Sequence, residues 1–143
     1  MALTFLGTIE ENLEGFSITK HDLKGKGISK NIFKHLKSKG LKVTNHKQIG
    51  FLKFYIDIDY KDGCAGVEII LADKLVNDSG NNGEVQKLFG QTYYYTKHYK
   101  DIVNVVMILV IGEKNLEKDP KIKEIKKHIE GLGATFKYLS SKG

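Results

Sequence analysis

Apolar side chains recur at intervals of three and four residues in four segments of the chain, which is the spacing of one face of an α-helix. This pattern predicts helices over residues 8–16, 29–38, 84–99 and 120–131. The last helix has the clearest start, because Asp119 is a favoured N-cap residue and Pro120 suits the first helical position.

The middle of the chain has the pattern of a β-hairpin. Residues 51–60 and 64–71 flank Asp62-Gly63, a dipeptide favoured in tight two-residue turns. A later run, residues 102–111, is almost wholly apolar, which is typical of a strand covered on both faces, and residues 135–139 fit a short edge strand. Because a helix separates these last two strands, the order predicts an α/β fold with a mixed central β-sheet flanked by helices on both faces.

One face of the predicted hairpin is polar. With Asp62 and Gly63 as the turn, the ladder puts Asp57 opposite Glu68, and Lys53, Tyr55 and Asp59 share their face. Opposed carboxylates repel each other, so something must offset them. A bound Mg²⁺ would do so, because that ion is held by one or two carboxylates together with water and phosphate. Pairing with Lys53, or exposure of the acids to solvent, would serve equally.

Length and composition indicate one globular domain. The chain has 143 residues, of which 41% are hydrophobic and 28% are charged. We assign it as a single domain, residues 1–143, with a core of about residues 29–111, an N-terminal helix over 8–16 and a C-terminal helix and strand over 119–139. No apolar run is long enough to cross a bilayer and the first residues do not resemble a secretion signal, so we expect a cytoplasmic protein with no membrane partner.

The net charge of +6 is the balance of 23 basic and 17 acidic residues, and every basic residue is lysine. Lysine binds phosphate as a point charge but lacks the planar fork with which arginine reads guanine. Any binding of DNA or RNA is therefore expected to occur through backbone phosphates, unless the lysines serve solubility alone. The expected contacts are the lysines of two predicted helices: Lys121, Lys123 and Lys127 in the last helix, and Lys34 and Lys37, with Lys39, at the second.

Three stretches together resemble the core of the PD-(D/E)XK nuclease superfamily. They are KGISKNIFKHLKSKGLKVTNHKQIG, FLKFYIDIDYKDGCAGVEIILA and EVQKLFGQTYYYTKHYKDIVNVVMILV, and the resemblance covers about residues 29–111. In that superfamily a helix precedes a strand that carries an aspartate, a Glu-x-Lys strand follows the hairpin, and a helix with a glutamine and a tyrosine comes before a buried strand. The resemblance implies a restriction-endonuclease-like fold and Mg²⁺-dependent cleavage of phosphodiesters.

The resemblance also implies a site, and the chain departs from it at two positions. Gly66-Val67-Glu68 matches the acidic metal ligand, but Ile70 stands where the family has its catalytic lysine. The usual spacing puts Tyr55 at the aspartate position, whereas a shorter spacing would use Asp57. The catalytic set implied by the resemblance is Asp57, Glu68, Lys53, Gln91 and Tyr95, with Asp57 and Glu68 as the Mg²⁺ ligands. Gln86 is an alternative glutamine, and Lys74 and Lys87 are alternative positions for a relocated lysine.

Three hypotheses of function follow. The first, which we favour, is a nucleic-acid-binding domain with a nuclease-like fold and a degraded catalytic site, because isoleucine can neither orient nor activate water. The second is an active Mg²⁺-dependent DNA or RNA phosphodiesterase with a relocated lysine. The third is a protein-interaction module that keeps only the fold and can form a homodimer.

Overall fold

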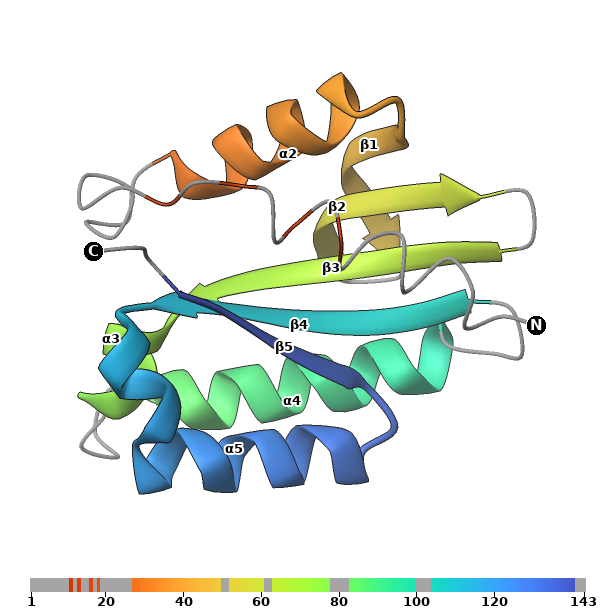
Figure 1. Cartoon of the computed structure of the whole chain (residues 1–143). Coiled ribbons are helices and arrows are strands. Elements are labelled where there is room, and N and C mark those ends of the chain that lie inside the picture. Colours follow the sequence, from red (N-terminus) through yellow and green to blue (C-terminus); the bar gives the residue numbers. More distant parts are fainter. Residues whose placement is uncertain are drawn as a thin grey trace.

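The computed structural model describes residues 27–49, 52–60, 63–77, 83–99 and 104–140, together with Glu11, Leu13, Phe16 and Ile18. Figure 1 shows a sheet with helices over both of its faces. Within these residues, no helix is both long and apolar enough to cross a membrane.

Five strands form one sheet in the order in which they occur along the chain. The strands are β1 (Lys42–Ile49), β2 (Leu52–Tyr60), β3 (Gly63–Leu71), β4 (Asn104–Gly112) and β5 (Thr135–Ser140). The pairs β1–β2 and β2–β3 are antiparallel, whereas β3–β4 and β4–β5 are parallel. The sheet is therefore mixed, as predicted, with its parallel half at the C-terminal end of the chain.

Helical crossovers connect the parallel strands, because such strands cannot be joined by a tight turn. The elements between β3 and β4 are α3 (Ala72–Val76) and α4 (Glu84–His98), and those between β4 and β5 are the 3₁₀ helix η2 (Lys114–Lys118) and α5 (Pro120–Gly131). Helices α4 and α5 lie on one face of the sheet, and α2 (Ile28–Ser38) lies on the other (Figure 1).

Alternate residues of β4 fill two separate cores. Met107 and Leu109 pack with Ile32 and Leu36 of α2. The even-numbered residues of the same strand pack under α4 and α5; they are Val106, Ile108 and Val110. All side chains from Val105 to Ile111 are buried. The prediction of a strand covered on both faces is confirmed, and β5 lies at the edge of the sheet as expected.

Three of the four predicted helices, α2, α4 and α5, are confirmed, and their ends agree with the prediction to within one residue. In α5, the Asp119 side chain accepts a hydrogen bond of 2.8 Å from the backbone N–H of Lys121, which is the predicted N-cap. The predicted helix over residues 8–16 lies outside the described residues except for Glu11, Leu13 and Phe16. Of these, Leu13 is buried in the core beneath α2.

The pattern analysis missed β1. Its sequence, KVTNHKQI, contains few apolar residues, because β1 is an edge strand and its Lys42 and Thr44 side chains face solvent. An edge strand with so few apolar residues presents too weak a pattern to be recognised without its partner.

The predicted register of the hairpin is wrong by two residues. The ladder closes on the pair Tyr60–Gly63, so Gly63 belongs to β3 and residues 61–62 connect the strands. Asp57 consequently pairs with Gly66 and not with Glu68. Because side chains alternate with period two, a shift of two residues leaves Asp57 and Glu68 at positions on the same face of the sheet.

Candidate functional site

Glu68 is a carboxylate buried within the sheet. It lies on β3, only 9% of its surface is exposed, and it faces the layer that contains α4. The hydroxyl of Tyr95, itself buried on α4, donates a hydrogen bond of 2.9 Å to Oε2 of Glu68. A buried acid normally has such a partner, because an unpaired one would lose its hydration without compensation.

Burial changes the ionisation of this pair. It raises the pKa of Glu68 from 4.5 to about 7, although hydrogen bonds from Tyr95 and from the Ile69 backbone, and the charge of Lys87, act in the opposite direction. Burial and the neighbouring Glu68 raise the pKa of Tyr95 well above its ordinary value. Tyr95 therefore stays a hydrogen-bond donor at neutral pH, while Glu68 exchanges its proton in that range.

Three polar side chains of helix α4 form a stripe along this part of β3. Lys87, Gln91 and Tyr95 follow one another at intervals of four residues, so they share one face of the helix. Their exposure falls along the stripe: Lys87 is exposed, Gln91 is half-buried and Tyr95 is buried. The stripe thus runs from solvent to the buried carboxylate.

A cavity of about 330 Å³ lies beside Glu68. Its polar lining is Glu68, Lys74, Glu84, Lys87 and Gln91, and its apolar lining includes Ile28, the first residue of α2. Glu68 to Leu71 are the last four residues of β3, and all four line the cavity, so the site lies at the C-terminal end of this strand.

The structure brings together part of the predicted catalytic set. Glu68 and Gln91 line the same cavity, and Tyr95 bonds to Glu68. The side chains of Asp57 and Lys53, like that of Tyr55, lie outside the described residues, so their predicted roles stay predictions. Gln86 is exposed on α4 and is not part of the cavity lining.

Two of the candidate lysines do reach the cavity. Ile70 lines it at the position where the resemblance implies a lysine, and Lys74 of α3 and Lys87 of α4 line it as well. Sequence reasoning missed Glu84, which also lines the cavity. Its spacing of three residues from Lys87 was the available signal, since such residues share a helix face.

The described part of the site offers oxygen donors that suit Mg²⁺. Glu68 and Glu84 supply carboxylates and Gln91 supplies an amide oxygen, which are ligand types that hard cations prefer. Among the side chains that the structure describes, no three His, Cys, Asp or Glu residues gather closely enough to hold a metal ion by themselves. A cation here would need Asp57, water or a substrate phosphate to complete its coordination.

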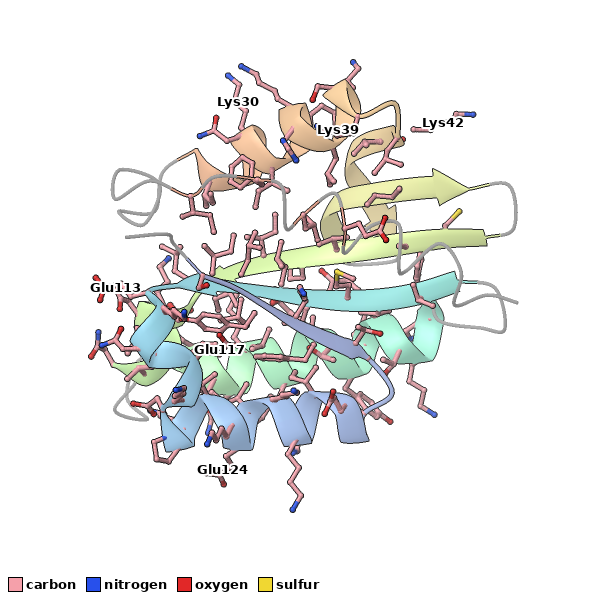
Figure 2. The ribbon with its side chains drawn as sticks, viewed as in Figure 1. Lys30, Lys39, Lys42, Glu113, Glu117 and Glu124 are labelled. Atoms are coloured by element: carbon pink, nitrogen blue, oxygen red, sulfur yellow. The ribbon has the colours of Figure 1, made fainter. Side chains whose placement is uncertain are left out.

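The two predicted lysine sets lie on opposite faces of the sheet and differ in their surroundings. Between residues 28 and 44, at α2, the chain has five lysines and no acid; between residues 113 and 131, at η2 and α5, it has six lysines and five acids. Figure 2 shows Lys30, Lys39 and Lys42 on the α2 side, and Glu113, Glu117 and Glu124 on the other. The α2 segment, residues 28–44, is therefore positively charged throughout, whereas the η2–α5 segment, residues 113–131, is nearly balanced.

Comparison with known proteins yields a structural similarity. The structure of SfsA from Pyrococcus furiosus in complex with Ca²⁺ has 17% sequence identity to this chain and superposes with a TM-score of 0.48. The match covers 79% of this chain and 56% of the SfsA chain, so the chain spans little more than half the length of SfsA. No family model and no curated protein sequence matches the chain.

Proposed function

We propose that this protein is a nucleic-acid-binding domain of the PD-(D/E)XK type, which holds a backbone phosphate in the cavity beside Glu68. The observation that carries the proposal is the lining of that cavity, where Lys74, Lys87 and Gln91 lie around the end of β3, beside the carboxyl groups of Glu68 and Glu84. Two lysines and an amide are suited to a phosphodiester, because lysine contacts phosphate as a point charge and the amide N–H₂ group donates hydrogen bonds.

The α2 face extends this site over the molecular surface. Ile28 begins α2 and lines the cavity, and the exposed lysines of the helix, Lys30, Lys34 and Lys37, continue from there. A backbone leaving the cavity in this direction meets five lysines and no acid between residues 28 and 44. Such a surface attracts a polyanion without regard to sequence.

Hydrolysis is weak or absent in this proposal, for two reasons. Ile70 has neither charge nor a hydrogen-bonding group with which to orient an attacking water. The raised pKa of Glu68 also leaves it protonated for a large part of the time near neutral pH, and a protonated carboxyl is a poor metal ligand.

Binding to a fluorescent single-stranded and a double-stranded oligonucleotide tests the proposal. We expect the Lys74→Gln, Lys87→Gln double variant to bind about tenfold more weakly than the native protein at ~50 mM salt, because two phosphate contacts are lost. The Lys114→Gln, Lys127→Gln variant is the matched control, since it loses the same charge from exposed positions that do not line the cavity. If the native protein showed no salt-sensitive binding to either oligonucleotide, the proposal would be refuted. That result would favour the third hypothesis, a protein-interaction module that can form a homodimer.

A second candidate function is Mg²⁺-dependent phosphodiester hydrolysis, and the position of Lys87 favours it. Lys87 lines the cavity and lies near enough to Glu68 to lower its pKa, so it could stand in for the lysine absent at Ile70. Glu68, Gln91 and Asp57 would then hold the ion, which would supply charge stabilisation at the phosphate. Cleavage in Mg²⁺ or Mn²⁺ that both Glu68→Gln and Lys87→Gln abolish, while Lys97→Gln retains it, would establish this function.

A further inference from the structure

A second cavity, of about 590 Å³, lies on the opposite side of the sheet from α2, at the edge strand β5. It shares no lining residue with the cavity beside Glu68. Its walls are η2, α5 and β5, which contribute Glu117, Lys118, Ile122, Lys123, Lys126, Phe136, Lys137 and Tyr138. A cavity of this volume accommodates a ligand of the size of a nucleotide.

Charge is unevenly distributed around this cavity. The η2–α5 segment, residues 113–131, is nearly balanced, with six lysines and five acids. The lining, however, contains four lysines and only one acid, Glu117. Lys123 and Lys126 are three residues apart on α5 and therefore project from one face of the helix. The lining thus has a net charge of +3, to which Lys137 of β5 contributes one, whereas the whole η2–α5 segment has a net charge of only +1.

The floor of the cavity is aromatic. Phe136 and Tyr138 are two residues apart on β5, so they stand side by side on one face of the strand. Both are half-buried, with one side packed against the core that contains Ile122 and Ile125. The hydroxyl of Tyr138 donates a hydrogen bond of 2.6 Å to the backbone carbonyl of Glu113, which fixes the orientation of its ring.

We propose that this cavity binds a nucleoside phosphate, with the base against the Phe136 and Tyr138 rings and the phosphates against Lys123 and Lys126. Aromatic side chains provide stacking surfaces for any base, and lysines neutralise phosphate. The ligand is either a free nucleotide or a terminal nucleotide of a single strand, since the two present the same chemistry. The inference does not rest on the function proposed above, because the two cavities have no residue in common.

Titration of the ¹⁵N-labelled full chain with ATP, tripolyphosphate and a 5′-phosphorylated hexathymidylate, followed by NMR, tests this site. We expect ATP to shift the amides of Lys118, Lys123 and residues 136–138, and to bind about tenfold more tightly than tripolyphosphate because the base stacks. If ATP binds more tightly than the oligonucleotide, the ligand is a free nucleotide; the reverse order assigns the site to a strand end. Tripolyphosphate that binds as tightly as ATP would overturn the proposal.

Matched variants separate this site from general charge. Lys123→Gln with Lys126→Gln should weaken ATP binding about tenfold, whereas Lys114→Gln with Lys127→Gln should change it less than about twofold, although both remove two exposed lysines from the same segment. Phe136→Leu should remove the preference for ATP over tripolyphosphate. Equal losses in the two lysine variants, or no shift at the lining residues at millimolar ATP, would refute the site. The Lys74→Gln, Lys87→Gln variant should retain ATP binding, which distinguishes failure here from failure of the proposed function.

Discussion

Burial and hydrogen bonding act on the Glu68 carboxyl in opposite directions. Removal from water disfavours the charged form, while the Tyr95 hydroxyl and the Ile69 N–H favour it, and burial has the larger effect. Ionisation of Glu68 inside the sheet therefore costs more free energy than ionisation of a glutamate in water. A carboxylate retained at such a position is a candidate for function, because strongly shifted pKa values concentrate at functional sites.

This ionisation predicts a pH-dependent stability. The pKa of Glu68 is about 7 in the folded protein and has its ordinary value of 4.5 in the unfolded chain. Between these pH values the carboxyl of the unfolded chain loses its proton, while that of the folded protein keeps it. Stability should thus be highest below pH 4.5 as far as Glu68 is concerned, fall as the pH rises to about 7, and then level off, with a total loss of about 3 kcal/mol.

Glu68→Gln isolates this contribution. The free energy of unfolding of the variant, relative to that of the native protein, should rise by about 3 kcal/mol between pH 4.5 and pH 8. Urea unfolding at four pH values in the presence of a chelator measures the difference, and comparison with the native protein cancels the titration of all other groups. A difference that does not vary with pH would show that Glu68 ionises as it would in water.

At the scale of elements, α5 and α4 illustrate which features a local sequence specifies. The α5 start follows from Asp119 and Pro120 alone, and the N-cap hydrogen bond is present as expected. Asp119→Ala should therefore lower the free energy of unfolding by about 1 kcal/mol. Glu124→Ala, an exposed position in the middle of the same helix, is the control and should change stability by less than about 0.5 kcal/mol. Equal effects in chemical denaturation would refute the cap.

Two glycines in different elements should respond oppositely to the same substitution. A Cβ added at Gly112, at the end of β4, would lie 2.5 Å from the Tyr138 hydroxyl oxygen and 2.6 Å from the Cβ of Ala72. Gly112→Ala should thus destabilise the fold by about 1–3 kcal/mol. Gly90, in α4, has open space around it, so Gly90→Ala should stabilise by about 0.5–1 kcal/mol. Thermal unfolding distinguishes the two, and loss of stability in both would contradict the described packing.

At the scale of the whole molecule, the sheet is protected unequally. β4 has a strand on each side and a core on each face, whereas β1 and β5 are edges. The amides from Val105 to Leu109 should accordingly exchange with solvent among the slowest in the protein, and those of β5 faster. Hydrogen exchange followed by NMR measures this order, and rapid exchange in β4 would contradict its interior position.

The separation of the two lysine surfaces by the sheet yields a prediction about salt. If α2 contacts the backbone, Lys34→Gln with Lys37→Gln should reduce the slope of log affinity against log salt by about two units, one for each lost contact. Lys114→Gln with Lys127→Gln should leave the slope unchanged, because these lysines lie among acids on the other face. Affinity measured between 50 and 200 mM salt tests the difference, which would vanish if binding depended on net charge alone.

The sequence by itself determined the three described long helices, the buried strand β4 and the mixed α/β class, because each depends on local periodicity and capping. It also pointed to Glu68, Gln91 and Tyr95, through a resemblance in short motifs. The tertiary structure decided what depends on distant partners: the register that pairs Asp57 with Gly66, the edge strand β1, and the meeting of Lys74 and Glu84 beside Glu68. The physical reason is that register, burial and the convergence of side chains are properties of pairs of segments, and local patterning constrains each segment separately.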